Sequence, residues 1–401
     1  MIQRHPAHDK IGQLPSVKRL DFIFFDAGGG HRSAANALKA VIEQQGRPWE
    51  IRLVNLQEVL DPLDIFRKLT GIRMQDVYNH MLKKGFTLGS GALVVAMHAI
   101  IRLYHRQQVK LLAEWWKRNG FPDLAVSLVP NFNRALFQGL RLASPGMPFV
   151  TILTDLADYP PHFWMERQQQ YLICGTERAV EQARALGYPD ERVFATSGMI
   201  LRPKFYETVE VDRNEERKRL GLMPGRPTGL VLFGGEGSSW MLEIAKTVDR
   251  LKLGIQLIFI CGRNQRLREQ MRALKLSFPM FVEGFTGEIP YYMHLSDFFI
   301  GKPGPGSLSE ALEMKLPVIV ERNAWTLPQE RYNTEWIREH EVGVVLKSFR
   351  QIGEGLSEML DPANLAGFRA NAAAVRSRAV FEIPEILEGL LAAKSHEIGA
   401  L

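Results

Sequence analysis

Cysteine is scarce in this chain of 401 residues, which contains only Cys174 and Cys261. The two lie far apart, each inside an apolar run typical of a strand (YLICG and LIFICG). Isolated cysteines provide neither the spacing of a zinc site nor a disulfide framework, so we expect both to be buried apolar side chains in a reducing compartment. Nothing about these two positions supports a cysteine-based active site.

The chain also lacks a long hydrophobic run. Residues 1–20 contain charge and proline where a signal peptide or anchor would be apolar. The apolar run at 92–101 is far shorter than the ~20 residues needed to span a bilayer. With 46% hydrophobic and 23% charged residues, the composition is that of a globular protein that folds in water. We therefore expect a cytoplasmic protein with two domains.

Positive charge is concentrated in one segment. Residues 1–205 contain 26 Lys and Arg against 18 Asp and Glu, whereas the rest of the chain contains 24 against 26. Residues 67–118 alone contain ten basic residues and two acids, in an amphipathic helical pattern. We expect this segment to lie on an anionic membrane surface. The alternative is a core helix with a solvated cationic face, and we expect no nucleic-acid partner because no recognition motif accompanies the charge.

Two similar α/β halves follow one another in the sequence. Each opens with a strand, a glycine turn and a helix. Strand patterns separated by helical stretches predict parallel sheets, and they lie at 20–25, 49–56, 122–130, 148–156, 170–176, 228–233, 255–262, 280–285, 297–302 and 317–321. Proline and charge interrupt the pattern near 201–217. We therefore predict domains at 1–205 and 206–375, and a helix at 376–401 that packs back on the first domain.

Three glycine turns connect predicted strands to helices, at 27–31 (AGGGH), 234–239 (GGEGSS) and 302–310 (KPGPGSLSE). Backbone N–H groups and the positive end of a helix dipole meet at such turns, which favours a bound diphosphate. The first turn does not fit a dinucleotide fingerprint, because Ser33 stands where a glycine is needed. The other two lie in one half of the chain and together predict a nucleotide site, with tight connections as the alternative.

A longer set of motifs occurs in a fixed order along the chain. It consists of DAGGGHRSAANAL at 26–38, TDLADYPPHFW at 154–164, GTERAVEQARALG at 175–187, GMILRPKF at 198–205, FGGEGSSWM at 233–241, CGRN at 261–264, EGF at 283–285, GKPGPGSLSEAL at 301–312 and Gln329-Glu330-x-x-Asn333. In this order the motifs resemble the monogalactosyldiacylglycerol synthases and related bacterial diacylglycerol glycosyltransferases. The peptidoglycan lipid-linked N-acetylglucosamine transferase is a more distant relative.

The resemblance implies a GT-B fold, in which two Rossmann-like domains face each other across a cleft. The first domain would bind the acceptor and the membrane, and the second would bind a UDP-sugar. Inversion at the anomeric carbon would follow, with no metal or other cofactor. An Asp-x-Asp triplet, which binds metal and diphosphate in the other large glycosyltransferase fold, is absent from the chain. Loop N–H groups and helix dipoles would then stabilise the leaving group.

The resemblance also assigns residues on the acceptor side. His31, in the first glycine turn, is the expected catalytic base, because an imidazole is mostly neutral at cytoplasmic pH. Asp26 or Asp155 would orient its ring. The alternative is a histidine that only shapes the turn. The remaining residues expected to contact the acceptor are Gly29, Gly30 and Arg202.

On the donor side, the glycine-proline-glycine helix with its glutamate would bind the uridine. Glu310 would accept hydrogen bonds from the ribose, and Phe285 would lie near the uracil. The full set of expected donor-binding residues is Gly235, Gly237, Ser238, Arg263, Phe285, Gly304, Pro305, Gly306, Ser307, Glu310, Gln329, Glu330 and Asn333.

The function implied is transfer of a hexose from UDP-galactose or UDP-glucose to a lipid, with diacylglycerol as the expected acceptor, at the inner face of the cell membrane. Three alternatives stay open. They are a UDP-N-acetylglucosamine-dependent transferase, a non-catalytic lipid-binding protein of the same fold, and a UDP-sugar epimerase or hydrolase. The sugar and the lipid are undecided, because SLVPNFN at 127–133 and ERNAWTLPQE at 321–330 differ from the plant sequences.

Overall fold

Two parallel sheets, each of six strands, form the framework of the protein. The computed structural model describes residues 17–26, 29–63 and 99–399. In spatial order the first sheet contains β2 (Trp49–Asn55), β1 (Lys18–Phe24), β3 (Leu124–Ser127), β4 (Phe149–Ile152), β5 (Tyr171–Cys174) and β6 (Val193–Ala195). The second contains β12 (Gly343–Leu346), β11 (Val318–Glu321), β10 (Phe298–Gly301), β7 (Thr228–Leu232), β8 (Gln256–Ile260) and β9 (Met280–Glu283).

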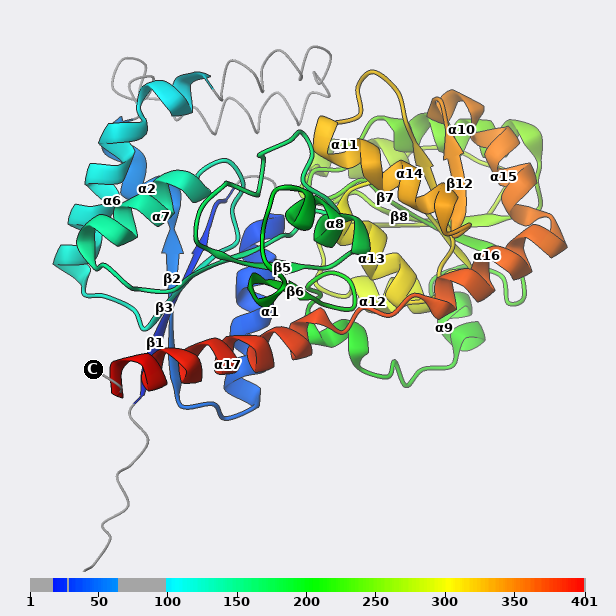
Figure 1. Cartoon of the computed structure of the whole chain (residues 1–401). Helices are drawn as coiled ribbons and strands as arrows, with labels where there is room; N and C mark the ends of the chain where they lie inside the picture. Colours follow the sequence, from blue (N-terminus) through cyan, green and yellow to red (C-terminus); the bar gives the residue numbers. More distant parts are fainter. Residues whose placement is uncertain (1–16, 27–28, 64–98, 400–401) are drawn as a thin grey trace, which may run out of the picture.

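The predicted tandem α/β layout is confirmed, and Figure 1 shows the two sheets as two lobes. The predicted strand patterns correspond to ten of these strands. Two edge strands, β6 and β12, were not predicted. β6 has three residues, and only two of the four side chains of β12 are buried, so neither forms a long buried apolar run.

Helices cover both sheets. Those of the first lobe are α1 (Gly30–Gln44), α2 (Leu56–Leu60), α6 (His105–Asn119), α7 (Asn133–Ala143) and α8 (Glu177–Ala185), with short 3-10 turns η1 (Asp61–Leu63), η2 (Asp190–Arg192) and η3 (Pro203–Tyr206). The second lobe contains α9 (Arg213–Arg219), α10 (Trp240–Leu251), α11 (Gln265–Arg272), α12 (Ile289–His294), α13 (Pro305–Glu313), η4 (Pro328–Glu330), α14 (Arg331–Glu339), η5 (Phe349–Gln351), α15 (Ile352–Leu360) and α16 (Pro362–Ala374). In the described ranges, no helix is both long and apolar enough to cross a membrane.

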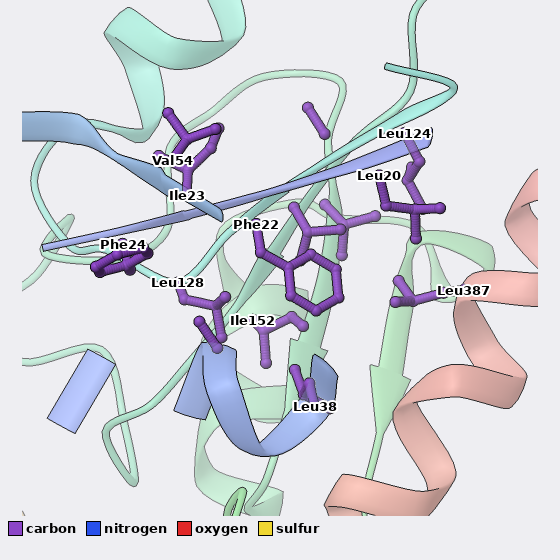
Figure 2. Packing of buried hydrophobic residues seen from close by; sticks show 14 of the residues in the cluster. Leu20, Phe22, Ile23, Phe24, Leu38, Val54, Leu124, Leu128, Ile152 and Leu387 are labelled. Carbon is purple, nitrogen blue, oxygen red and sulfur yellow. The ribbon is translucent and has the colours of Figure 1, made fainter. Parts of the chain in front are cut away.

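The core of the first lobe surrounds β1. This strand reads as a nearly continuous apolar run because helices cover both faces of a parallel sheet. Figure 2 shows Phe22 of β1 among Leu38 of α1 and Ile152 of β4, all almost fully buried. The last helix, α17 (Ala379–Gly399), adds Leu387 to the same core and contacts α1. In Figure 1 this helix (red) runs from the second lobe back along the first.

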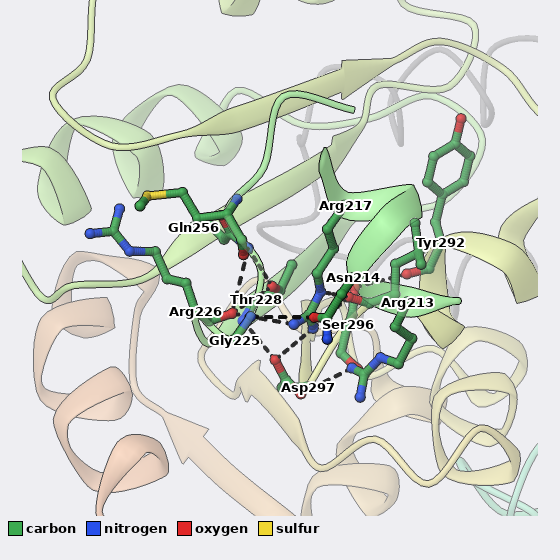
Figure 3. Close-up of polar contacts among 12 residues, drawn as sticks. Arg213, Asn214, Arg217, Gly225, Arg226, Thr228, Gln256, Tyr292, Ser296 and Asp297 are labelled. Atoms are coloured by element: carbon green, nitrogen blue, oxygen red, sulfur yellow. Dashed lines mark hydrogen bonds and ion pairs between the residues drawn. The ribbon is translucent and has the colours of Figure 1, made fainter. Parts of the chain in front are cut away.

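The connection between the lobes packs on the second sheet. Met199, Leu201 and Phe205 lie in the hydrophobic core beneath β10 and β11, although the predicted boundary assigned them to the first domain. A polar cluster fixes the following helix, α9, to the start of two strands (Figure 3). The carboxylate of Asp297, just before β10, accepts hydrogen bonds from Arg217 at 2.9 Å and from the backbone N–H of Thr228 at 2.8 Å.

Candidate active site

His31 lies in the first turn of α1, beyond the carboxyl end of β1. Gly29, just before the helix, has φ +81°, in the left-handed region that favours glycine. Because all strands of this sheet are parallel, the segment after β4 reaches the same edge. Two side chains meet there, with His31 Nδ1 3.0 Å from Thr154 Oγ1. Gly30 is the first residue of the helix and leaves open space around its Cα.

Burial controls the charge of this imidazole. Loss of hydration disfavours the protonated form and lowers the pKa of His31 from 6.5 to about 4, although a hydrogen bond with the backbone of Leu128 opposes the shift. The indole of Trp164 packs edge-on against the ring, with the two ring centroids 5.8 Å apart. His31 is therefore neutral at neutral pH and is able to accept a proton.

The two acids expected to orient His31 have other partners. Asp26 forms an ion pair with Arg32 at 3.1 Å. Asp155 accepts a hydrogen bond from the indole N–H of Trp164 at 2.9 Å. Burial is the main cause that raises the pKa of Asp155 from 3.8 to about 7; the hydrogen bond from Trp164 opposes the shift, and the negative charge of Glu330 contributes to it. In the structure, the side-chain hydroxyl that contacts the imidazole belongs to Thr154.

Across the crevice, α13 begins directly after β10 with the predicted glycine turn. Gly304 is its N-cap residue, followed by Pro305 in the first turn, as is favoured at helix starts. Glu310 lies one turn further and is largely buried, which raises its pKa from 4.5 to about 7. Arg202, from the segment between the lobes, opposes that shift with a guanidinium nitrogen 3.8 Å from the Glu310 carboxylate. Arg202 therefore contacts the expected donor side.

Glu330 stands close to the start of the same helix. A Cβ added to Gly304 would lie 3.5 Å from Glu330 Oε1 and 3.7 Å from the hydroxyl of Ser307. Burial raises the pKa of Glu330, and the nearby positive charge of Lys302 lowers it. Gln329 precedes Glu330 in η4 and is half-buried. The start of α13 is therefore a place where N–H groups, a lysine and carboxylates meet.

Asn333 supports this turn from below. Its side chain is fully buried, and its amide nitrogen donates a hydrogen bond to the carbonyl of Pro303 at 2.7 Å. Among the described atoms its amide oxygen is buried without a partner. Asn333 is thus placed to hold the backbone before α13, whereas the sequence analysis expected it to face the donor directly.

A second glycine turn flanks the start of α10. Gly237 has φ +63°, and a Cβ there would lie 2.8 Å from the carbonyl of Cys261, so a larger residue would not fit. Gly235 accepts a hydrogen bond from the backbone N–H of Arg263 at 2.8 Å, and Ser238 Oγ accepts one from the start of α10. The Arg263 guanidinium lies over the ring of Phe285, 4.0 Å from its centroid. That ring is 61% exposed and offers an open aromatic face.

The segment after β4 in the first lobe faces η4 and α14 in the second lobe. Asp155 of the first lobe and Glu330 of the second interact electrostatically, and the rings of Tyr159 and Tyr332 approach to 5.7 Å between centroids. A cavity of about 690 Å³ lies beside these rings and is lined by both lobes, for example by Leu156 and by Leu308 of α13. The predicted site residues are not among those that line it. The segment after β4, whose Thr154 contacts His31, lies close enough to Glu330 at the start of α13 for Asp155 and Glu330 to interact.

Some residues at this site were missed by the sequence analysis. Thr154 and Trp164 lie inside the motif TDLADYPPHFW, and Lys302 lies inside KPGPGS. The motifs therefore indicated the segments that form the site, but not which side chains of these segments contact each other. Within the described residues, no group of three His, Cys, Asp or Glu side chains is arranged to hold a metal ion. The site offers a neutral imidazole, several hydrogen-bond acceptors and a helix N-terminus.

Comparison with known proteins gives relatives along most of the chain. No family model matches it. Monogalactosyldiacylglycerol synthase of Spinacia oleracea is 28% identical over 400 residues, which cover 94% of this chain and 74% of the plant protein. Among solved structures, MurG of Acinetobacter baumannii has a TM-score of 0.58 at 11% identity and covers 93% of this chain and 99% of its own.

A second solved structure extends the fold to a different enzyme class. UDP-GlcNAc 2-epimerase of Neisseria meningitidis, solved bound to UDP-GlcNAc, has a TM-score of 0.59 at 15% identity and covers 93% of this chain and 100% of its own. At such low identity these likenesses establish the fold alone. The chain therefore has the two-domain GT-B fold, and the resemblance to the monogalactosyldiacylglycerol synthases that its motifs predicted is confirmed along nearly its whole length.

Proposed function

We propose that the protein is an inverting glycosyltransferase that moves a hexose from a UDP-sugar to the hydroxyl of a lipid, with UDP-galactose or UDP-glucose as donor and diacylglycerol as acceptor. One observation supports this most strongly. The neutral imidazole of His31 contacts Thr154, and the next residue, Asp155, interacts electrostatically with Glu330 of the second lobe. Glu330 stands at the start of α13, the helix that contains the buried carboxylate of Glu310. The similarity to monogalactosyldiacylglycerol synthases supports the choice of sugar and lipid.

The donor would lie along the second lobe. Its diphosphate would face the N-terminus of α13, where the helix dipole and Lys302 favour negative charge. Glu310 would accept hydrogen bonds from the ribose hydroxyls. The exposed ring of Phe285, with Arg263 stacked on it, would support the uracil. Helix and loop N–H groups would stabilise the departing UDP.

The acceptor would react on the first lobe. Its hydroxyl proton passes to the imidazole of His31 while its oxygen forms a bond to the anomeric carbon. The bond between that carbon and the diphosphate oxygen breaks at the same time, and UDP leaves with the electron pair. Attack opposite the leaving group inverts the anomeric centre. Because burial lowers the pKa of His31 to about 4, the imidazole is neutral at neutral pH before the transfer.

The test is to incubate the protein with UDP-galactose, UDP-glucose or UDP-N-acetylglucosamine and diacylglycerol vesicles, and to identify the glycolipid by mass. His31→Ala should abolish turnover and leave UDP affinity nearly intact, whereas His294→Ala, at the end of α12, serves as the matched histidine control because His294 is also partly buried with a lowered pKa. A UDP-sugar epimer formed without acceptor, or full turnover by His31→Ala, would contradict the proposal. Lipid binding without any product would favour the non-catalytic alternative.

Membrane attachment is the second part of the proposal. Of the predicted docking segment 67–118, residues 67–98 lie outside the described part of the chain. In the remainder, one exposed face is strongly basic, with a single acid, Glu114, among its charges. Its exposed cations are Arg102, Arg106, Lys110, Lys117 and Arg118. Each contributes about 1 kcal/mol near an anionic surface, so we propose attachment to the inner face of the cell membrane.

Charge reversal tests the attachment. Lys110→Glu combined with Lys117→Glu should reduce co-sedimentation with vesicles containing anionic lipid, and added salt should reduce that of the unchanged protein. Lys218→Glu combined with Lys246→Glu, two exposed lysines of the second lobe, provides a control of equal charge change. Binding that is indifferent to lipid charge and to salt would exclude this surface.

A further inference from the structure

We propose that Thr154 and Trp164 are positioning residues for His31. Thr154 contacts the imidazole through its hydroxyl. The indole of Trp164 packs against the imidazole and is itself held by a hydrogen bond to Asp155. This inference rests on the proposed role of His31 as base, and it gives Asp155 an indirect role in place of the direct orientation expected from the sequence.

Thr154 is the direct contact. Its Oγ1 lies 3.0 Å from His31 Nδ1, although the two residues are 123 positions apart in the chain. Thr154 lies two residues beyond β4, an inner strand that pairs with β3 and β5, and the backbone N–H of the intervening Leu153 donates to the carbonyl of Ile173 at 3.1 Å. A hydroxyl in a fixed place gives the ring one preferred orientation.

A hydroxyl is able to donate to Nδ1 or to accept from it, so the proposal specifies the direction in which Nδ1 donates to Thr154. A neutral imidazole has one N–H donor and one acceptor nitrogen. When Nδ1 donates to Thr154, Nε2 is the unprotonated nitrogen and is free to take a proton from a hydroxyl. After that transfer both nitrogens are donors, and Thr154 continues to accept. The same hydrogen bond therefore serves the imidazole before and after proton transfer.

The indole of Trp164 packs against the imidazole of His31. Its side chain is fully buried, and its ring centroid lies 5.8 Å from that of His31 at an interplanar angle of 60°. The indole N–H donates to Asp155 Oδ2 at 2.9 Å. Thr154 and Asp155 are consecutive, so one short segment after β4 acts on the imidazole twice, once directly and once through the indole.

The backbone around Trp164 is fixed as well. Asp158 accepts its N–H at 2.6 Å, and the amide nitrogen of Asn133 donates to its carbonyl at 2.8 Å. Asn133 is itself buried and accepts a hydrogen bond from Ser127, at the end of β3, at 2.6 Å. These bonds tie the indole to the neighbouring strand. Trp164 is therefore unable to move away from His31 without breaking several buried hydrogen bonds.

The first experiment replaces the hydroxyl. Thr154→Val preserves the shape of the side chain and removes the contact with Nδ1, whereas Thr154→Ser restores a hydroxyl. We expect kcat to fall about 10- to 100-fold in the valine variant, because the base is misplaced. The KM for UDP-sugar should stay within about 2-fold of that of the unchanged enzyme. In the serine variant kcat should recover. Nitrogen NMR of labelled histidine should show one dominant tautomer of His31, a mixture in Thr154→Val, and one tautomer again in Thr154→Ser.

The second experiment replaces the indole of Trp164. Trp164→Phe retains a ring but loses the bond to Asp155, so water should reach the imidazole and its pKa should rise from about 4 toward 6.5. Trp116→Phe is the matched control, because Trp116 is equally buried and donates to Asp21 at the same distance of 2.9 Å, away from His31. Asp155 and Glu330 also have raised pKa values. The titration is therefore followed by NMR on the His31 ring itself and not inferred from the pH dependence of the rate.

The outcomes separate the two proposals. The inference would be overturned if Thr154→Val changed neither the tautomer pattern nor kcat. It would also be overturned if the pKa of His31 stayed near 4 in a folded Trp164→Phe variant. In either case, loss of activity in His31→Ala would still support the proposed function. Retained activity in His31→Ala would overturn the proposed function, and the NMR measurements would still decide whether Thr154 and Trp164 control the ring. If Trp164→Phe does not fold, the Thr154 pair alone decides.

Discussion

Two buried hydrogen bonds between a tryptophan and an aspartate stabilise the first lobe. Trp116 of α6 donates to Asp21 within β1, and Trp164 donates to Asp155 beyond the end of β4. Both distances are 2.9 Å, and both indoles are almost completely buried. The two pairs therefore have the same geometry and differ in what surrounds the carboxylate.

The difference lies in the counter-charge. Asp21 also accepts hydrogen bonds from Arg52 of β2, at 2.7 and 2.6 Å, so its charge is neutralised where it is buried. In the described residues no cation pairs with Asp155, which instead faces the negative charge of Glu330. A buried carboxylate with a guanidinium is a stable anchor, whereas one without it has a raised pKa. The pair without a cation is the one at the crevice.

The largest effect is expected from Asp21→Ala. This change leaves Arg52 without its buried carboxylate and Trp116 without an acceptor, so we expect unfolding free energy to fall by about 3–5 kcal/mol. Urea denaturation followed by circular dichroism measures it. Asp155→Ala should destabilise the protein less, because only an indole N–H loses its partner. Equal losses for the two variants would show that the counter-charge does not distinguish these pairs.

Asp155→Asn should increase the stability of the protein at high pH, whereas Asp155→Ala should decrease it. The pKa of Asp155 is about 7 in the folded protein and 3.8 without burial, so the folded state binds more protons between these values and stability falls as pH rises through them. Asparagine removes this titration and still accepts from Trp164. We expect a variant on the order of 2 kcal/mol more stable than the unchanged protein above about pH 8, and nearly equal to it at about pH 4. A constant difference across this range, measured by urea denaturation, would be incompatible with the raised pKa.

Trp116→Phe and Trp164→Phe should reduce stability by similar, smaller amounts, about 1–3 kcal/mol each, because each removes one hydrogen bond to a buried carboxylate. The loss for Trp116→Phe should lie at the lower end, because Asp21 Oδ2 retains its bond from Arg52. Thermal unfolding of the two purified variants tests this. Their stabilities should be alike while their effects on His31 differ. A Trp164 variant that was much less stable than the Trp116 variant would argue for a mainly structural role of the indole.

The smallest effect is expected from Glu330→Gln. Removing this negative charge should lower the pKa of Asp155 and shift the pH range of its stability loss downward. The shift is read from stability curves of the variant with and without Asp155→Asn, in a double-mutant cycle. No shift would mean that the two carboxylates are too far apart to interact.

Much of the fold and part of the site follow from local sequence. Apolar runs bounded by turns predicted the inner strands, and the glycine turns before α1 and α13 correctly marked two helix starts at carboxyl edges. The edge strands β6 and β12 were missed because β6 has only three residues and β12 is only partly buried. The motif did not predict that Asn333 is buried and donates to the carbonyl of Pro303, because the burial of a helical residue depends on the segments that pack against it.

The sequence by itself determined two parallel α/β halves, the residues that begin their helices, and the likeness to galactolipid synthases. Only the tertiary structure decided which polar groups meet. Thr154 reaches His31 because parallel strands end at one edge of the sheet, and Arg202 reaches Glu310 because the segment between the lobes packs on the second core. Periodicity reports the face on which a side chain lies, but partners, burial and pKa depend on groups that are distant in the chain and adjacent only after folding.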